Sequence, residues 1–208
     1  MQPLAMRIGA WLFRRRTLIP LPLAAAILLL RVGQTQGSTL PVAAGVLLTA
    51  AGEALRLWGV HHIGVISRTR SARVGPLVAA GPFAFVRNPL YLGNIALWAG
   101  FALIARLVWL VPVAVVVLVL VYDAIVRWEE RLLDDRLGDA YRSYAARVPR
   151  WLPAFNRGDG RDLDVSVGSG PSAVERGAFT WRATLFSERG TLIAMLAGYA
   201  LLWLKARF

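Results

Sequence analysis

Residues 81–130 read GPFAFVRNPLYLGNIALWAGFALIARLVWLVPVAVVVLVLVYDAIVRWEE. A short polar turn leads into a long apolar run, which ends in two adjacent carboxylates. Residues 90–105 and 107–126 are each roughly long enough for a membrane helix, with Arg106 at the bend between them. Because a helical hairpin returns to the membrane face where it began, the two polar ends of this stretch are predicted to lie together.

The two polar ends carry opposite charges. The first end is cationic or hydrogen-bonding and contains Arg87, Asn88, Pro89 and Tyr91. The second end is anionic and contains Glu129 and Glu130. A helix start with free N–H groups beside a guanidinium suits a carboxylate or a phosphate. The facing charges therefore predict a site for a zwitterionic ligand.

A purely structural explanation covers part of this pattern. Asn88 is a favoured N-cap, and Pro89 is a favoured first residue of a helix. Gly93 would let either a ligand or a neighbouring helix approach the backbone closely. Neighbouring residues on a helix point about 100° apart, so at most one of Glu129 and Glu130 faces the site squarely. Pairing with a nearby arginine is the alternative for both carboxylates.

The composition excludes a soluble globular protein. The chain has 208 residues, is 57% hydrophobic and 17% charged, and has a mean hydropathy of +0.53. We assign the net charge of +12 to arginines that flank membrane helices and bind anionic lipid head groups, not to nucleic-acid binding. Without cysteine, the chain has no disulfide and no thiolate metal site.

The predicted fold class is therefore all-α, a polytopic integral membrane protein with about five transmembrane helices. The expected helices are residues 17–32, 40–60, 90–105, 107–126 and 190–204. Four regions are expected: an N-terminal basic segment with two membrane helices and a basic connector (1–80), a core of hairpin and amphipathic helix (81–153), a polar cytoplasmic loop (154–189), and a final membrane helix (190–208).

Three further segments are expected at the membrane surface. Residues 1–16 carry four arginines around Trp11 and Phe13 and are typical of a basic amphipathic lead-in. Residues 128–148 have the spacing of an amphipathic helix, which Gly138 interrupts. Residues 179–186 are expected to form a short interfacial helix.

Two polar features lie at the end of the second expected membrane helix. Glu53 and Arg56 are three residues apart, which puts them on one face as an ion pair or as the lining of a polar cavity. His61 and His62 are too few to form a catalytic zinc site, which needs three protein ligands. We therefore predict no metal site.

Arginines set the expected orientation. The N-terminus and residues 61–89 and 127–189 carry nearly all of them, so these parts are predicted to be cytoplasmic. The N-terminus and the site then lie inside and the C-terminus outside.

The blocks GPFAFVRNPLYLGN and EERLLDDRLGDAYRSYAARVPRWLP resemble the membrane methyltransferases related to isoprenylcysteine carboxyl methyltransferase and phospholipid methyltransferases. That family shows a Gly-Pro-aromatic turn, an Arg-His-Pro-x-Tyr motif, a helical hairpin, a Glu-Glu pair, and a Gly-x-x-Tyr-x-x-Tyr ending before Val-Pro. The likeness covers residues 81–153. Two positions depart from the pattern: Asn88 replaces the histidine, and Leu137 replaces a phenylalanine before Gly138.

The resemblance implies S-adenosylmethionine as the methyl donor and a lipid or lipidated molecule as the acceptor. It places Tyr141 and Tyr144 near the cofactor, and it gives the motif around Arg87 and the pair ending in Glu130 the roles of cofactor binding and catalysis. Since asparagine cannot act as an acid or base near neutral pH, no histidine base is expected at position 88. The sequence leaves open whether a carboxylate or an amine is methylated.

Two other classes of function remain open from the sequence. One is a nicotinamide-dependent membrane reductase, like the distantly related sterol reductases. The other is a membrane adaptor without catalysis. The sequence contains no indication of oligomeric state.

Overall fold

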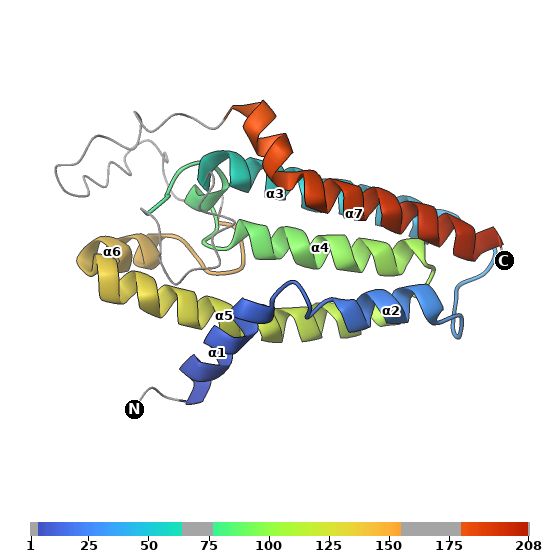
Figure 1. Cartoon of the computed structure of the whole chain (residues 1–208), viewed down its shortest axis with the longest axis horizontal. Coiled ribbons are helices and arrows are strands. Elements are labelled where there is room, and N and C mark those ends of the chain that lie inside the picture. The colour runs from blue at the N-terminus through green and yellow to red at the C-terminus, as the bar shows by residue number, and fades with distance from the viewer. Residues whose placement is uncertain (1–3, 64–76, 155–179, 208) are drawn as a thin grey trace. The chain divides into compact units, whose positions relative to one another are not determined.

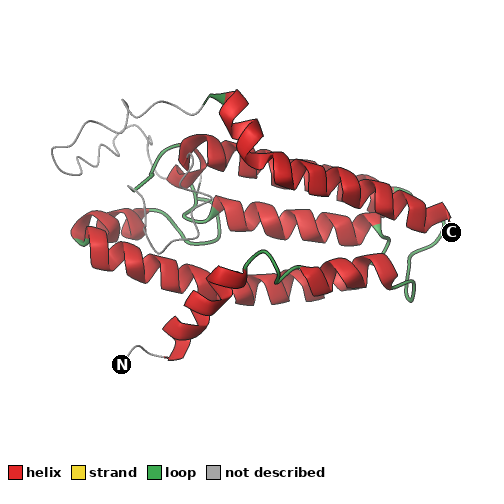
Figure 2. Cartoon of the chain, in the orientation of Figure 1, coloured by secondary structure: helices red, strands yellow, loops and turns green. Residues whose placement is uncertain are grey.

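The computed structural model describes residues 4–63, 77–154 and 180–207 (Figure 1). The elements follow in the order α1 (Leu4–Arg15), α2 (Leu21–Leu29), α3 (Leu40–Ile63), the 3-10 helix η2 (Gly81–Ala84), α4 (Pro89–Ile104), α5 (Leu110–Leu137), α6 (Asp139–Arg147) and α7 (Trp181–Arg207). Every regular element among the described residues is helical, which confirms the all-α prediction (Figure 2).

The structure divides into two units. Unit 1 comprises Met1–Ala54, Tyr91–Trp128 and Arg189–Phe208. Unit 2 comprises Leu55–Leu90 and Glu129–Glu188. Helices α3, α4, α5 and α7 each contribute residues to both units.

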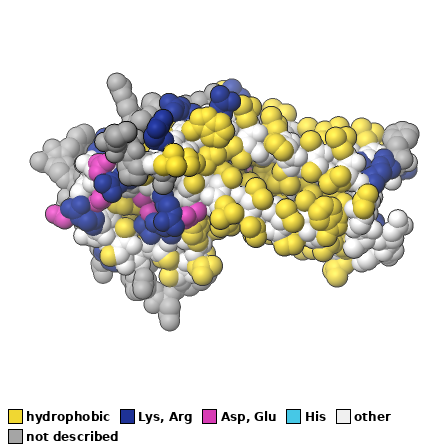
Figure 3. Space-filling view, turned by 90° about the horizontal axis from the view of Figure 1, so that it is seen from below, with side chains coloured by type: hydrophobic (Ala, Val, Ile, Leu, Met, Phe, Trp, Pro, Cys, Tyr) yellow, Lys and Arg dark blue, Asp and Glu magenta, His cyan; other side chains and the backbone are white. Residues whose placement is uncertain are grey.

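The long helices make this a polytopic integral membrane protein. Helices α3, α5 and α7 are long and apolar enough to cross a membrane, and α4 is a shorter apolar helix. Within unit 1, α5 exposes Val113, Val116, Val117 and Leu120. Figure 3 shows hydrophobic side chains covering much of the visible face of this unit. Since a bilayer offers no water to hydrogen-bond, helices of this kind suit its interior.

The predicted hairpin is present. Helix α4 ends at Ile104 and α5 begins at Leu110, with Arg106 at the bend in a left-handed conformation (φ 60°). Near the open end, the rings of Tyr91 and Tyr122 stack at 4.7 Å.

Small residues allow α3 and α4 to approach closely in unit 1. A Cβ placed on Gly45 would lie 2.6 Å from the carbonyl oxygen of Gly100, and one on Gly52 would lie 2.8 Å from that of Gly93. Membrane helices gain no hydrophobic energy by leaving lipid, so close backbone packing at small residues is a main source of their association. The backbone of α4 at Gly93 is therefore one of the points that Gly52 of α3 approaches closely.

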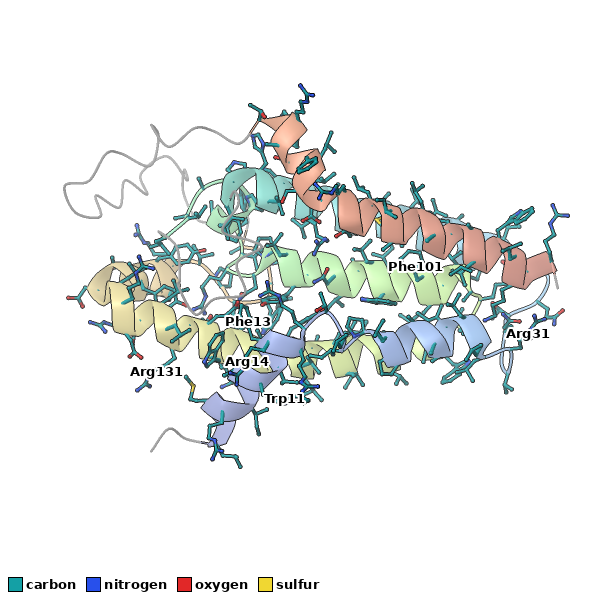
Figure 4. All side chains as sticks on the ribbon, viewed as in Figure 1. Trp11, Phe13, Arg14, Arg31, Phe101 and Arg131 are labelled. Carbon is teal, nitrogen blue, oxygen red and sulfur yellow. The ribbon has the colours of Figure 1, made fainter. Side chains whose placement is uncertain are left out.

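Helix α7 packs on the same pair of helices. The Thr49 side chain is fully buried, and its hydroxyl lies 2.5 Å from the hydroxyl of Tyr199. A Cβ placed on Gly198 would lie 2.9 Å from the ring of Phe101. Figure 4 places Phe101 between α4 and α7. These contacts join α3, α4 and α7 within unit 1.

The two ends of the chain differ from the prediction. Helix α2 has nine residues and is shorter than the expected helix, which spanned residues 17–32. Pro20 and Pro22 restrict the start of the helix, and the turn before it is not helical. Its length of about 14 Å is too short for α2 to cross a bilayer by itself. Gly9 of α1 packs against Trp128 of α5, and Ile27 of α2 packs with Leu110 at the start of α5, so α1 and α2 together extend along that span. The expected helices at 179–186 and 190–204 form one continuous helix, α7.

Glu188 explains why α7 is continuous. It is 3% exposed and its carboxylate lies 2.5 Å from the guanidinium of Arg56 on α3, both in unit 2. A buried charge can stay within a helix when it is paired. The polar residues near Glu188 therefore do not end the helix as the sequence suggested.

The close approach of α3 and α4 gives the first prediction. We expect Gly52→Ala to lower the free energy of unfolding by about 1–3 kcal/mol, because its Cβ would meet backbone that cannot move without separating the helices. Gly190→Ala on α7 is the control, since nothing lies within 4 Å of its Cβ position. Melting temperatures in detergent measure both changes, and equal values for the two variants would contradict the packing.

Candidate functional site

The turn before α4 depends on Gly81. This residue has a φ of 60°, and a Cβ on it would lie 2.5 Å from the ring of His62. The ring is held by a hydrogen bond of 2.9 Å between its Nδ1 and the carbonyl oxygen of Trp58. Only glycine combines this conformation with so close a neighbour. The Gly-Pro-Phe turn of the sequence motif is thereby fixed in unit 2.

A segment that follows α6 is tied to the start of α4. The amide of Arg87 donates to the carbonyl oxygen of Pro149 at 2.9 Å, and the amide of Ala154 donates to that of Phe85 at 3.1 Å. The Asn88 side chain donates to the carbonyl oxygen of Arg150 at 3.2 Å. We call residues 149–154 the strap. The two ends of the motif are therefore joined through their backbones.

Asn88 and Pro89 stand where the sequence predicts. Helix α4 begins at Pro89, so Asn88 occupies the N-cap position. The amide of Asn88 also holds the strap, a task that needs a donor and no acid or base. A ring N–H of histidine could donate in the same way.

Glu130 lies between two arginines. Its Oε1 is 2.9 Å from Nη1 of Arg87 and accepts from Nε of Arg150 at 3.1 Å. Its Oε2 accepts from Nη2 of Arg150 at 2.5 Å. The Glu130 side chain is 14% exposed. Both carboxylate oxygens are thus engaged by guanidinium groups in a partly buried place, where such bonds are strong.

Two buried tyrosines lie beside this cluster. The hydroxyl of Tyr141 accepts a hydrogen bond of 3.4 Å from Arg87. Burial raises the pKa of Tyr141 to about 12, the negative charge of Glu130 adds to the rise, and Arg87 opposes it. Burial likewise raises the pKa of Tyr144, whose hydroxyl donates to the carbonyl oxygen of Phe83 at 2.8 Å. Both phenols are therefore neutral near pH 7 and act as hydrogen-bonding groups.

The structure brings most of the predicted site residues into one unit. Unit 2 contains Arg87, Asn88, Pro89, Glu129, Glu130, Tyr141 and Tyr144. Of the two adjacent carboxylates, Glu130 makes the ion pairs with Arg87 and Arg150, while Glu129 is half-buried. Tyr91 and Gly93 belong to unit 1.

Arg150 is the residue that the sequence analysis missed. It lies in the Val-Pro-Arg-Trp-Leu-Pro segment, directly after the amphipathic pattern of residues 128–148. No periodicity connects it with Glu130, since the two are twenty residues apart with a helix break between them. The one available signal was a lone arginine between two prolines.

The other predicted polar groups have contacts of their own. Glu53 and Arg56 were expected to form an ion pair or to line a polar cavity, and the structure pairs Arg56 with Glu188. His61 stacks on Trp181 at 4.2 Å. Among the described residues, no group of three or more potential ligands could hold a metal ion. Residues 64–76 of the predicted connector and 155–179 of the predicted loop lie outside the described part of the chain.

These features define a polytopic membrane protein with a charged, hydrogen-bonded cluster in unit 2. Residues 40–140 match the phospholipid methyltransferase family. The match starts at residue 40 and ends at residue 140, whereas the resemblance predicted from the sequence covered residues 81–153. It confirms the resemblance and supports a membrane methyltransferase.

One curated relative is the cobalt-zinc-cadmium resistance protein CzcN of Cupriavidus metallidurans, which is 27% identical over 151 residues. The alignment covers 72% of this chain and 65% of the relative, less than two thirds of that protein's length. No solved structure matches the chain significantly.

The hydrogen bond from Tyr144 of α6 to the Gly-Pro-Phe turn gives the second prediction. We expect Tyr144→Phe to lower the free energy of unfolding by about 1–3 kcal/mol, because the carbonyl oxygen of Phe83 loses a buried donor. Tyr141→Phe should cost less, since its 3.4 Å hydrogen bond is long. Thermal unfolding in detergent compares them, and a smaller loss for Tyr144→Phe than for Tyr141→Phe would rule this out.

Proposed function

We propose that the protein is an S-adenosylmethionine-dependent methyltransferase that acts on a lipid or lipidated acceptor, through a carboxylate or an amine. The family supports methyl transfer. The observation that carries the proposal is the Arg87–Glu130–Arg150 cluster beside the start of α4. It offers opposite charges to the carboxylate and the ammonium group of a zwitterionic cofactor.

One unsatisfied atom supports the fit of such a ligand. The Nε of Arg87 is buried and has no hydrogen-bond partner among the described residues. A buried donor of this kind favours an acceptor, and a ligand carboxylate can supply one. We propose Arg87 for the cofactor carboxylate and Glu130 for its ammonium. Five further residues are proposed to complete the cofactor site: Asn88, Pro89, Glu129, Tyr141 and Tyr144. Tyr91 and Gly93 remain candidates from the motif.

In this proposal Arg87 has to separate from Glu130 when a zwitterion binds. Arg150 keeps both oxygens of Glu130 in place during the exchange, so it is a positioning residue. The cofactor would supply a methyl group on a positively charged sulfur. The protein's part is alignment of the acceptor and exclusion of water.

The acceptor determines whether a base is needed. A carboxylate is already a nucleophile and needs none. An amine has to lose a proton, which Glu129 or Glu130 could accept. The buried phenols are poor proton acceptors because their raised pKa values keep them protonated. We propose a lipophilic acceptor because a soluble one would not require a site among membrane helices.

Cofactor binding gives the third prediction. In detergent-purified protein, we expect S-adenosylhomocysteine to bind, and Arg87→Ala or Glu130→Gln to weaken binding about ten- to a hundredfold through loss of charge-assisted hydrogen bonds. The matched control is Arg131→Gln, next to Glu130 on α5 (Figure 4), whose side chain is 66% exposed. We expect no change for it.

Other outcomes identify the alternatives. Binding of NADPH in place of S-adenosylhomocysteine would indicate a reductase, and binding of neither would indicate an adaptor. Normal affinity in both site variants would refute the assignment of Arg87 and Glu130. A methyl donor with a labelled methyl group, incubated with a membrane lipid extract, then identifies the acceptor from its product.

Orientation gives the fourth prediction. We propose that the N-terminus and the site are cytoplasmic and the C-terminus is outside, because arginines concentrate in the N-terminal segment and in the segments around the site. Reporter fusions after Ala80 and after Phe208 should report inside and outside respectively. An inside result at Phe208 would contradict the proposed crossing of α7.

A further inference from the structure

Helix α1 is docked on α5 through one of its faces. A Cβ on Gly9 would lie 2.5 Å from the carbonyl oxygen of Ala124 and 2.7 Å from Cβ of Trp128. The buried ring of Phe13 lies 4.8 Å from the ring of Trp128. All of these residues belong to unit 1. The helix is therefore held against the membrane-spanning part of α5 by its own packing.

The opposite side of α1 carries an exposed apolar ridge. Leu4, Ile8 and Trp11 are 69%, 45% and 51% exposed. Their spacing of four and three residues puts them on one side of the helix. We call these three residues the ridge. An exposed ridge of this size on a packed helix indicates a contact with something outside the described chain.

Arginines surround the ridge. Arg7, Arg14 and Arg15 are exposed, and Arg16 follows the helix. The first acidic residue of the whole chain is Glu53, so no carboxylate in this segment can neutralise them. The guanidinium of Arg15 lies 5.3 Å from the ring centre of Trp11, and that of Arg16 lies 4.2 Å from the ring centre of Phe13. Figure 4 shows Trp11, Phe13 and Arg14 on this helix.

The surroundings identify the class of partner. Helix α5, on which α1 is packed, exposes aliphatic side chains along a helix that is long and apolar enough to cross a membrane. Apolar residues next to arginines are typical of helices that lie at the surface of a bilayer. Arginine binds phosphate through two parallel hydrogen bonds, so the phosphates of anionic lipids complement this charge.

We propose that α1 lies in the head-group layer of an anionic leaflet, with the ridge in the acyl region and the arginines on lipid phosphates. The partner is the lipid surface, not a second protein. Because α1 is locked to Trp128, its level in the head groups also sets the level of the end of the α5 span. This inference does not depend on the proposed enzymatic activity.

Because the chain has no cysteine, a single introduced cysteine can be labelled at one known position. Ile8→Cys in the full chain carries a fluorescent label, and the protein is reconstituted in phosphatidylcholine mixed with phosphatidylglycerol. A quencher is attached to one lipid or the other. We expect quenching by phosphatidylglycerol to exceed quenching by phosphatidylcholine. Val117→Cys is the control, since it is similarly exposed on the α5 span and lies ten or more residues from Arg106 and Arg127, and it should show no preference.

Removing the arginines should remove the preference. Each arginine near an anionic surface favours the charged lipid about fivefold, so Arg14→Gln, Arg15→Gln and Arg16→Gln together should reduce the preference up to about a hundredfold. An unchanged melting temperature establishes that the triple variant is folded. Added inorganic phosphate, compared with sodium chloride at equal ionic strength, should not compete.

Four results would overturn the proposal. The first two are equal quenching by the two lipids and an unchanged preference in the folded triple variant. The third is full competition by inorganic phosphate, which would indicate a soluble anion as the ligand. The fourth is no quenching by either lipid. In the last case, disulfide formation between two Ile8→Cys chains would identify a second copy as the partner.

Discussion

The ion pairs of Glu130 with Arg87 and Arg150 are the interaction on which unit 2 depends. They join the residues before α4, the last part of α5 (residues 129–137) and the strap. Removing one member of a partly buried pair costs more than the pair contributes, because the remaining charge is left without its partner. A second arginine changes this balance: Glu130 keeps one guanidinium when the other moves. A ligand with both charges can therefore replace part of the network without leaving a bare carboxylate.

Unit 1 is stabilised by a different kind of contact. Between α3 and α4 the backbones meet at glycines, and α7 joins them through Thr49 and Gly198. Such packing depends on shape, because lipid is as apolar as the side chains. The molecule thus combines a unit determined by close helix packing with a unit determined by charge and hydrogen bonds. The second unit contains the ion-pair cluster on which the proposed cofactor site rests.

The features that the sequence predicted well have local causes. The apolar hairpin, the helix break at Gly138 and the start of α4 at Pro89 follow from hydrophobicity and from the backbone preferences of glycine and proline. The candidate site residues were predicted from their order in the motif. Long-range pairing decided what the sequence did not predict: Glu188 stays in α7 because Arg56 faces it, and Arg150 reaches Glu130 across a turn whose path has no periodic pattern.

The strap also determines when, during synthesis, the cluster around Glu130 can be completed. Asn88 and the carbonyl of Arg150 that it holds are 62 residues apart. During synthesis the α4–α5 hairpin is made before the strap, because α5 ends at Leu137 and the strap begins at Pro149. A nascent chain that ends before Arg150 therefore carries Arg87 and Glu130 but lacks the second guanidinium and the backbone hydrogen bonds of the strap.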